Sequence, residues 1–357
     1  MSLIITVDCR HIDFSGIGVC IRGSLPYFLD SDNFFYLIGN PAKLEPFISG
    51  RKNVEVLDYR IRPFSLVELF FFPGRLLSKI NKSDLFLSPY FNIPGGIKVP
   101  VYTTIHDIIF PDMPEIVSRI GLELRMLFYR RAFSRSKKIF TVSEFSKSRI
   151  EHYSRKKVPV TVTYNAIQPW ISGNRAPVLA EKTKTIVFIG NIKKHKGLNY
   201  LLEAFLLAKA EGLPHQLVII GSRDNFRTSD NSFLRKLDSL PPNLVSFTGF
   251  ISNEKLVEYL SAAALLVQPS LYEGFGIPPL EAMVLGTQAL ISDIPAFREI
   301  YDGFPVVFFR AGSCMDLKEK LIHLLHNQAP RTVSLPEHLL LQYSFQRTSS
   351  IILQGMI

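Results

Sequence analysis

The chain has 357 residues and a formal net charge of +10, with 41 Lys and Arg against 31 Asp and Glu. Its length suits two domains, and its 47% hydrophobic and 20% charged residues exclude a mostly disordered protein. Cys9, Cys20 and Cys314 are too few and too widely spaced for a disulfide framework or a metal knuckle, which favours a reducing compartment. We expect the first residues to form a strand rather than a signal peptide, and no window approaches the ~18 apolar residues of a membrane span.

Strand-length apolar runs alternate with helix-length segments along the whole chain. Unbroken apolar runs are typical of parallel strands covered on both faces, so the sequence predicts an α/β, doubly wound, Rossmann-like architecture. The predicted strands are 4–7, 35–38, 85–88, 101–105, 138–142, 161–164, 185–189, 216–220, 244–248, 265–268, 287–292 and 306–309. A Pro- and Gly-containing stretch at 168–183 predicts a boundary between domains at 1–168 and 184–335. A helical tail follows at 336–357, with a break near Tyr343.

The positive charge is concentrated in the first half. Residues 1–170 hold 23 Lys and Arg against 15 Asp and Glu, whereas residues 171–357 hold 18 against 16. Such a field suits an anionic partner, namely a lipid surface, a diphosphate-linked acceptor or nucleic acid, although solubility alone would also account for it. Segments 60–82 and 119–138 interleave aromatic and cationic residues, as segments that lie on anionic bilayers do. The second segment also fits an amphipathic helix with a solvated basic face.

Three motifs of the first half follow predicted strands. Gly16 and Gly18 come after the first strand, but Gly23 is two residues late for a dinucleotide fingerprint, so a nicotinamide site is not expected and an ordinary turn fits. His106 ends strand 101–105, at the edge where open α/β sheets bind ligands, although a lone His there is often structural. Asp107 could orient that ring, bind acceptor hydroxyls or cap a helix.

Two further polar residues of the first half suit helix capping or the wall of a site. Ser143 is expected to cap a helix that has Ser146 in its first turn. Asn165 is read as structural or weakly functional.

The second half opens with a strand, a glycine and a cationic loop. Gly190 ends strand 185–189, and Lys193, Lys194, His195 and Lys196 precede a helix at 198–211. A lysine can reach across such a turn to a diphosphate as a mobile point charge. A solvated basic loop is the alternative.

Glu273 and Glu281 flank a Gly-x-Gly-x-Pro-Pro turn that follows strand 265–268. A helix is expected from about Pro279, because proline is favoured at the first helical position. The turn amides belong to Gly274, Phe275 and Gly276. Beside a helix N-terminus they would form an anion site, while carboxylates accept hydrogen bonds from sugar hydroxyls. The pattern therefore predicts a nucleotide-sugar site, although a turn-capping Glu273 and a solvated Glu281 would read similarly.

This Glu-x7-Glu segment strongly resembles the signature of the family-4 retaining glycosyltransferases, whose GT-B fold has two Rossmann-like domains facing a cleft. The resemblance runs nearly end to end and is strongest at 185–300. It implies a retaining transferase that moves a hexose from a nucleotide-sugar donor to a glycan or polyprenyl-diphosphate-linked acceptor in O-antigen, capsule or lipopolysaccharide synthesis. It also implies that the tail returns to the first domain, that no metal or other cofactor is needed, and that the protein is cytoplasmic, on the inner face of the cytoplasmic membrane.

The resemblance implies a role for each site residue. His106, Glu273 and Lys196 form the catalytic set, facing the donor sugar, holding its hydroxyls and binding its diphosphate, and Asp107 contacts the acceptor. The donor-binding residues are Gly16, Gly18, Asn191, Lys196, Gly274, Phe275, Gly276 and Glu281, the last on the ribose hydroxyls. The loop at 249–252 would hold the base through backbone groups.

Asn191 departs from the family, which has Arg at this position. Lys193, Lys194 or His195 could supply the missing charge. The Gly-Asn-x-Lys-x-His-Lys and Ser-Asp-Ile-Pro variants look more like bacterial surface-polysaccharide mannosyltransferases than like sucrose or glycogen enzymes, which favours GDP-mannose. UDP-glucose and UDP-GlcNAc remain alternatives. So do a non-catalytic nucleotide-sugar-binding scaffold and a nucleic-acid binder, although the latter lacks a recognition motif.

Overall fold

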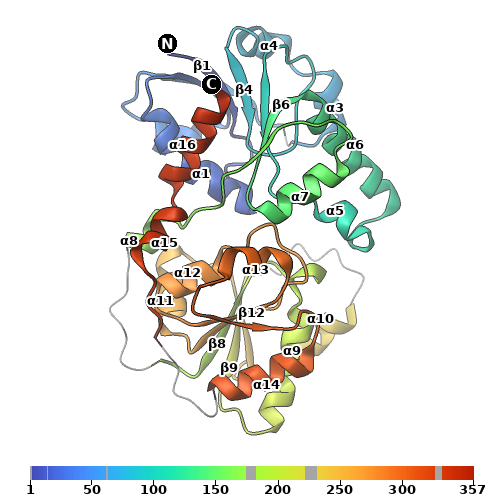
Figure 1. Cartoon of the computed structure of the whole chain (residues 1–357), viewed down its shortest axis with the longest axis vertical. Coiled ribbons are helices and arrows are strands. Elements are labelled where there is room, and N and C mark those ends of the chain that lie inside the picture. Colours follow the sequence, from blue (N-terminus) through green and yellow to red (C-terminus); the bar gives the residue numbers. More distant parts are fainter. Residues whose placement is uncertain (1, 14, 62, 174–181, 222–230, 326–331) are drawn as a thin grey trace. The chain divides into compact units, whose positions relative to one another are not determined.

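The computed structural model describes residues 2–13, 15–61, 63–173, 182–221, 231–325 and 332–357. The chain divides into two compact units (Figure 1). The first unit comprises Met1–Ala166 and Leu341–Ile357, and the second comprises Ile167–Leu340. Residues 174–181 of the predicted linker lie outside the described residues. Within the described ranges, every helix is too short or too polar to span a bilayer.

Each unit is built on one parallel sheet. The first sheet has the order β3-β2-β1-β4-β5-β6-β7. Its strands are β1 (Ile4–Asp8), β2 (Phe34–Gly39), β3 (Val54–Asp58), β4 (Leu85–Ser88), β5 (Val101–Thr104), β6 (Ser136–Thr141) and β7 (Val160–Val162). The second sheet has the order β10-β9-β8-β11-β12-β13. Its strands are β8 (Thr185–Ile189), β9 (Gln216–Ile220), β10 (Val245–Gly249), β11 (Leu265–Gln268), β12 (Ala289–Ser292) and β13 (Val306–Phe309). The predicted α/β, Rossmann-like class is confirmed.

Helices connect the strands in both units. Those of the first unit are α1 (Ser15–Leu29), α2 (Pro41–Ile48), α3 (Leu66–Phe70), α4 (Gly74–Ile80), α5 (Ile109–Asp112), η1 (Pro114–Ile116), α6 (Arg119–Arg135), α7 (Glu144–Tyr153) and α16 (Phe345–Met356). Those of the second are α8 (Pro169–Gly173), η2 (Lys194–Lys196), α9 (Leu198–Ala210), α10 (Asn231–Asp238), α11 (Asn253–Ala262), α12 (Pro278–Val284), α13 (Pro295–Tyr301) and α14 (Cys314–Leu325). Helix α15 (Glu337–Gln342) spans the division between the units.

The strand order of each sheet reverses direction once. From β8 the chain moves outward through β9 and β10, then returns to the other side of β8 at β11, and the first sheet does the same between β1 and β4. In open α/β sheets, ligands bind outside the carboxyl ends of the strands at such a reversal. The topology therefore marks one edge position in each unit as the place to look for chemistry.

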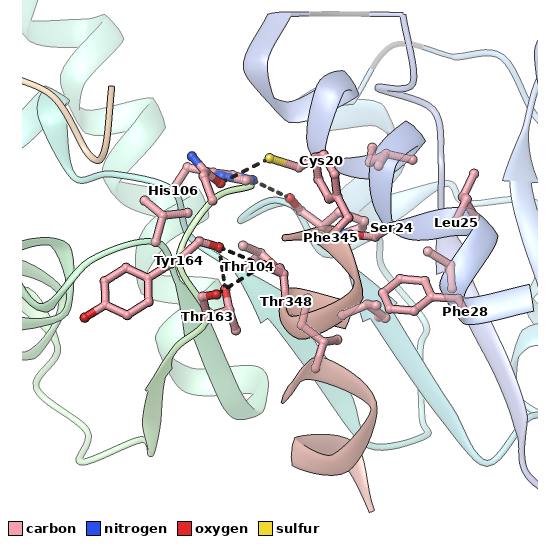
Figure 2. A pocket seen from close by; sticks show the side chains of 17 residues that line it. Cys20, Ser24, Leu25, Phe28, Thr104, His106, Thr163, Tyr164, Phe345 and Thr348 are labelled. Atoms are coloured by element: carbon pink, nitrogen blue, oxygen red, sulfur yellow. Dashed lines mark hydrogen bonds between the residues drawn. The ribbon is translucent and has the colours of Figure 1, made fainter. Parts of the chain in front are cut away.

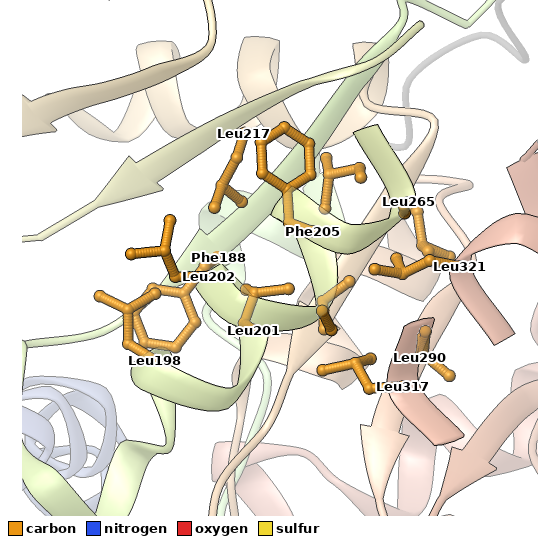
Figure 3. Close-up of a cluster of buried hydrophobic side chains, with 14 of the residues drawn as sticks. Phe188, Leu198, Leu201, Leu202, Phe205, Leu217, Leu265, Leu290, Leu317 and Leu321 are labelled. Carbon is orange, nitrogen blue, oxygen red and sulfur yellow. The ribbon is translucent and has the colours of Figure 1, made fainter. Parts of the chain in front are cut away.

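Apolar residues of strands and helices fill the core of the second unit (Figure 3). Phe188 of β8 and Leu265 of β11 lie in the same fully buried cluster as Leu201 and Phe205 of α9. Leu317 and Leu321 of α14 complete it. Because these strands are covered by helices, their side chains are apolar in unbroken runs, which is the pattern that the sequence displays.

One strand was missed by the sequence prediction. β3 pairs in parallel with β2 at the edge of the first sheet, and its sequence Val-Glu-Val-Leu-Asp mixes apolar and charged residues. An edge strand has less of its surface covered, so it lacks the unbroken apolar run of the central strands. The predicted break near Tyr343 is confirmed, because α15 ends at Gln342 and Ser344 caps α16 by accepting a hydrogen bond from the N–H of Arg347 at 3.3 Å.

A buried ion network ties α3 to the first sheet. Arg10, just after β1, donates from Nε and Nη2 to the carboxylate of Asp8 at 2.8 and 2.6 Å, and from Nη1 to Glu68 of α3. Asn92 and the N–H of Phe64 also donate to Glu68. Burial acts to raise the pKa of Asp8, but the charge and hydrogen bonds of Arg10 outweigh it, and the pKa is lowered.

Replacing Arg10 should destabilise the first unit strongly. Arg10→Leu would leave two carboxylates buried without a counter-charge, so we expect the free energy of unfolding to fall by about 3–5 kcal/mol in urea titrations. Arg60→Leu is the matched control, because its ion pair with Asp58 is solvent-exposed and its loss should leave stability close to the wild-type value. Equal stability of the two variants would contradict a structural role for the network.

Candidate functional site

The site in the second unit lies after two adjacent strands, β8 and β11. These strands pair in parallel at the reversal of the sheet order. The loop after β8 carries Asn191 and Lys196, and the loop after β11 carries Glu273. Parallel pairing brings both loops to the same edge, so the sheet itself draws together residues that are 77 positions apart.

Lys196 and Glu273 form a two-pronged ion pair at this edge. The Nζ atom of Lys196 donates to Oε1 and Oε2 of Glu273 at 2.7 and 2.8 Å, and Oγ of Ser270 donates to Oε1 at 2.7 Å. Burial acts to raise the pKa of Glu273, but the charge and hydrogen bonds of Lys196, with the bond from Ser270, lower it. Glu273 is therefore an ionised acceptor at neutral pH, held beside a cation.

A left-handed glycine fixes the lysine loop against the glutamate loop. Gly197 has φ +67°, and a Cβ there would lie 1.9 Å from the carbonyl oxygen of Pro269. The N–H of Leu271 donates to the carbonyl oxygen of His195 at 2.7 Å. Only glycine permits this close approach without strain, so the position of Lys196 depends on a residue that carries no chemistry.

Glu281 lies on α12, which begins at Pro278 as the proline pair predicts. It is buried, at 8% exposure, rather than on a solvated face. Burial raises the pKa of its carboxyl group to about 7, and no hydrogen bond reaches that group within the described part of the chain. Glu281 is thus poised between its neutral and charged forms near neutral pH.

The turn between the two glutamates is closely packed. Gly276 has φ +82°, and a Cβ there would lie 2.3 Å from the ring of Phe297. The side chain of Phe275 is buried in the core, so only its backbone can face a ligand. The amides of Leu280 and Glu281 already donate to the carbonyl oxygen of Ile277. The predicted anion site therefore depends on the backbone of the turn before α12 rather than on the helix N-terminus.

The missing positive charge at Asn191 does not come from His195. Burial, reinforced by the charge of Lys196, lowers the pKa of His195 to about 4, so its ring is neutral at neutral pH. Lys193 and Lys194 are exposed and stay as the candidates of this loop. Asn191 itself is half-buried beside Gly221, where a Cβ would lie 2.3 Å from the carbonyl oxygen of Gly190.

In the first unit, His106 follows β5 and lies beside the end of β4. Its Nε2 is 3.0 Å from the carbonyl oxygen of Pro89, and burial lowers its pKa, so the ring is neutral. Thr141 and Ser146 donate to the carbonyl oxygens of Ile105 and His106 at 2.7 and 3.2 Å and fix the backbone there. A neutral imidazole suits a group that faces a sugar rather than one that donates positive charge.

Asp107 does serve the start of a helix. Its Oδ1 accepts a hydrogen bond from the N–H of Ile109 at 3.1 Å, at the start of α5. Ser143 caps α7 as expected, accepting from the N–H of Ser146 at 3.0 Å. Because the N-cap of α5 is Ile108, Asp107 lies one residue before the cap, and both a capping role and a contact with an acceptor stay predictions.

Gly16 and Gly18 do not lie in a loop. Both belong to the first turn of α1, which starts at Ser15, so the predicted Gly-rich loop is corrected to a helix start. A Cβ on Gly18 would lie 2.5 Å from the carbonyl oxygen of Ile12 and 2.7 Å from that of His11. Close packing onto the preceding turn explains the second glycine, while a Cβ on Gly16 would meet open space.

His11 and Ser270 lie in the candidate sites but were not predicted from the sequence. His11 follows β1 at the reversal of the first sheet and packs edge-on against Tyr90, with ring centroids 4.4 Å apart. Burial is the main reason that its pKa falls to about 4, with nearby Arg10 and His106 contributing. The position of His11 just beyond the first strand is the signal that could have identified it. Ser270 had no signal beyond its closeness to Glu273.

A cavity of about 30 Å³ lies within the first unit, bounded by α1, α16 and the sheet (Figure 2). Its lining is mostly apolar, with His106, Cys20 and Asn165 among the polar groups, and the Sγ of Cys20 donates to Oδ1 of Asn165 at 3.3 Å. This volume holds one or two water molecules, not a sugar. Asn165 is therefore part of the packing around His106.

The described residues contain no cluster suited to binding a metal ion. No group of three or more His, Cys, Asp or Glu side chains there could hold an ion. The sequence does contain one Asp-x-Asp triplet, Asp30-Ser31-Asp32, but it lies between α1 and β2, at the amino end of the strand. Asp30 pairs there with Arg51 at 2.7 Å. Independence of metal stays a prediction.

A known protein family matches within the second unit. Residues 174–337 match the family model for glycosyl transferases group 1. The chain is 27% identical over 248 residues to the O-antigen chain mannosyltransferase RfbU of Salmonella typhimurium, and 27% over 232 residues to O-antigen chain mannosyltransferase B of Escherichia coli. The matches cover 68% and 61% of this chain but only 65% and 59% of those relatives.

Solved structures share the whole fold. The Anabaena protein Alr3699/HepE, crystallised with UDP-glucose, superposes with a TM-score of 0.72 over 99% of both chains at 17% identity. At that identity the likeness establishes the fold alone. Neighbours that share these two Rossmann-like parallel-sheet domains are GT-B glycosyltransferases, so the chain has their fold.

Removing the titrating group at Glu281 should change how stability depends on pH. Because burial raises its pKa from 4.5 to about 7, the stability it contributes is fully present below its unfolded pKa and is lost as the pH rises through about 7. Glu281→Gln should therefore be on the order of 2–3 kcal/mol more stable than the wild type at about pH 8, and nearly equal to it at about pH 4.5. Urea unfolding at both pH values checks this.

The exposed Glu319 provides the control. Glu319→Gln should follow the wild-type dependence on pH throughout. A constant difference between Glu281→Gln and the wild type at the two pH values would show that Glu281 does not titrate in this range.

Proposed function

We propose that this chain, whose residues 174–337 match the family model for glycosyl transferases group 1, is a retaining, metal-independent glycosyltransferase. It moves a hexose from a nucleotide-sugar donor to a glycan or lipid-linked acceptor in the synthesis of a bacterial surface polysaccharide. The observation that carries this proposal is the Lys196–Glu273 pair, which lies at the reversal of the second sheet.

The ion pair suits a site that exchanges partners when the donor binds. The donor brings a diphosphate and a ring of hydroxyls to the same place. Lys196 then leaves Glu273 for the diphosphate, and Glu273, ionised because of its lowered pKa, accepts hydrogen bonds from the sugar hydroxyls. The pair keeps both groups charged and positioned before the donor arrives, so little reorganisation accompanies binding.

Breaking the glycosidic bond builds negative charge on the leaving diphosphate. Lys196 is held beside that charge by Gly197 and Pro269, and a preorganised cation lowers the barrier. The backbone of Gly274–Gly276 adds dipoles in the same turn, and Glu281 meets the ribose hydroxyls. A carboxyl group with a pKa of about 7 can accept a hydrogen bond from one hydroxyl or, when protonated, donate to another.

The first unit provides the acceptor side. We assign His106 to the reaction as a neutral ring, which can contribute a hydrogen bond but no charge. Asp107 accepts a hydrogen bond at the start of α5, and we assign its carboxylate to the acceptor hydroxyl. Retention requires no side-chain base here, because the leaving phosphate can take the acceptor proton.

Mannose from GDP-mannose is the favoured donor. Two relatives that match most of this chain carry the name O-antigen mannosyltransferase, which supports both the sugar and the polysaccharide class. UDP-glucose and UDP-GlcNAc are the alternatives, and the fold match to a UDP-glucose complex supports a nucleotide-sugar donor in general. Fold does not determine substrate, so the donor must be measured.

The proposed place of action is the cytoplasmic side of the inner membrane, where a polyprenyl-diphosphate acceptor would be presented. The excess of positive charge in residues 1–170 supports an anionic surface there. Asn191, in place of an arginine, is the feature that favours the rival proposal of a non-catalytic nucleotide-sugar-binding scaffold.

Donor hydrolysis separates the enzyme from the scaffold. We expect the wild type to hydrolyse one of a panel of GDP-, UDP-, ADP- and dTDP-sugars slowly, and Glu273→Gln to lose roughly 100-fold of that rate because Gln cannot carry the charge that holds the hydroxyls and Lys196. Glu319→Gln is the matched control in the same unit and should retain the rate.

If no nucleotide sugar in the panel is hydrolysed, donor binding measured by thermal shift distinguishes the remaining alternatives. A donor that stabilises the wild type without being hydrolysed, with or without acceptor lipid, would favour the scaffold. If no nucleotide stabilises the protein at all, the proposed donor site is wrong.

Lys196 should act mainly on the rate. Lys196→Ala removes the cation that meets the leaving diphosphate, so kcat should fall by about 10²–10³-fold. Lys318→Ala, which removes a cation from α14, is the control and should leave kcat unchanged. A rise in KM alone for Lys196→Ala would show that the residue binds donor and transition state equally and does not stabilise the leaving group.

A further inference from the structure

Helix α3 presents large apolar side chains to solvent. Phe70 and Phe71 are each 76% exposed, and Leu66 and Val67 are about half exposed. Single exposed apolar residues are ordinary, but a contiguous group on one short helix marks an interaction surface.

A stripe on α6 adds to this surface. Ile120, Leu124 and Leu127 are exposed, and Ile120 reaches 83%. Their spacing of four and three residues places them on one face of the helix. Arg131, four residues further along this face, donates from Nε to the carbonyl oxygen of Ile93 at 2.8 Å. The stripe therefore runs toward the loop that contains Ile93.

That loop, residues 93–97, also touches α3. The N–H of Gly95 donates to the carbonyl oxygen of Glu68 at 2.9 Å. A Cβ on Gly95 would lie 2.0 Å from the carbonyl oxygen of Leu69. Helices α3 and α6 thus border the same loop, and Figure 1 shows them on the same flank of the first unit. The apolar face, as we call it, consists of Leu66, Val67, Phe70, Phe71, Ile120, Leu124 and Leu127.

The buried ion network keeps the apolar residues of α3 facing solvent. Glu68 lies between the exposed residues of α3, yet its side chain is fully buried and bonded to Arg10, Asn92 and the N–H of Phe64. A five-residue helix has little stability of its own, so its position depends on this anchor. Phe70 and Phe71 consequently cannot turn inward without breaking a buried ion pair.

The sequence segments that carry the apolar face are rich in positive charge. Residues 60–75 contain three Arg and one Glu, and residues 119–135 contain five Arg and one Glu, a net charge of +6. Arg75 and Arg119 are exposed. Aromatic residues among cations suit the headgroup region of an anionic bilayer. A second copy of the chain would bring an equally positive face, and like charges would oppose that pairing.

The apolar face begins at the edge of the sheet where chemistry is expected. Phe64 immediately precedes the cap of α3, and its ring lies 5.7 Å from that of His11 and 5.8 Å from that of Tyr90. Those two residues follow β1 and β4, at the reversal of the first sheet. A membrane that meets the apolar face would therefore lie next to the carboxyl ends of these strands.

We propose that the apolar face docks the protein on an anionic lipid bilayer, with Phe70 and Phe71 entering the headgroup region. Docking would present the carboxyl edge of the first sheet to an acceptor whose lipid stays in the membrane. The inference rests on the proposed function for its acceptor, but the surface and its partner are defined by side chains that the transfer reaction does not use.

Co-sedimentation with vesicles tests the surface directly. The wild type should bind phosphatidylcholine vesicles that contain phosphatidylglycerol more tightly than vesicles of phosphatidylcholine alone. Phe70→Ser/Phe71→Ser should weaken that binding at least ~10-fold, because two aromatic rings no longer leave water. The matched control, Leu207→Ser/Met315→Ser, removes two exposed apolar side chains from helices of the second unit and should bind as the wild type does.

A second variant that gains a fluorescence signal on binding keeps the proposal testable if the double Ser variant fails to fold. Trp170 is the single tryptophan of the chain. Phe70→Trp keeps the apolar face intact and adds a reporter, whose emission should shift to the blue on anionic vesicles and be quenched by lipids with brominated acyl chains. Met315→Trp should show neither change.

Each result decides something separate. Wild-type affinity for vesicles in Phe70→Ser/Phe71→Ser, or an unquenched Phe70→Trp, would overturn the proposal, as would a dimer that this double variant converts to a monomer in sedimentation velocity. Donor hydrolysis without vesicles is measured alongside. If it survives in the double variant while vesicle binding is lost, the docking surface stands apart from the active site. If the wild type binds vesicles but never turns over a donor, the proposed function fails and the docking surface stands.

Discussion

A parallel sheet brings all of its strand ends to one edge, and the candidate sites of this protein depend on that constraint. In the second unit it brings Lys196 and Glu273 within hydrogen-bonding distance although 77 residues separate them. In the first unit it places His11 and His106 after β1 and β5 of the same sheet. In the second unit, Lys196 and Glu273 lie where the reversal of strand order opens a position between β8 and β11.

The buried carboxyl groups of this protein have three different electrostatic environments. Asp8 and Glu68 share one arginine and serve structure, because they lock α3 onto the sheet. Glu273 has a lysine whose loop is fixed by Gly197, and this pair can exchange partners with a ligand. Glu281 has no counter-charge in the described residues, so burial alone raises its pKa to about 7. A buried, uncompensated carboxyl group destabilises a protein at neutral pH, which is reasonable where a ligand would later provide its hydrogen bonds.

The buried ion network of the first unit also determines which side chains α3 presents to solvent. Arg10 neutralises the carboxylate that anchors α3, and α3 holds Phe70 and Phe71 in solvent. One buried interaction therefore determines both the stability of the sheet edge and the orientation of the proposed membrane-docking face. This coupling explains how so short a helix can present two aromatic rings outward without collapsing onto the core.

The sequence by itself determined the α/β class, twelve of the strands and the loops that carry Lys196, Glu273 and His106. Unbroken apolar runs and glycines at strand ends are local signals, and each can be read without knowing its partner. Its errors lie where packing decides: β3 is an edge strand that includes charged residues, and Gly16 and Gly18 start a helix, with Gly18 packed closely on the preceding turn. Only the tertiary structure decided that Glu281 is buried, that His195 is neutral, and that Asp8, Arg10 and Glu68 meet. Burial and charge pairing are properties of residues brought together from distant parts of the chain, so no local pattern records them.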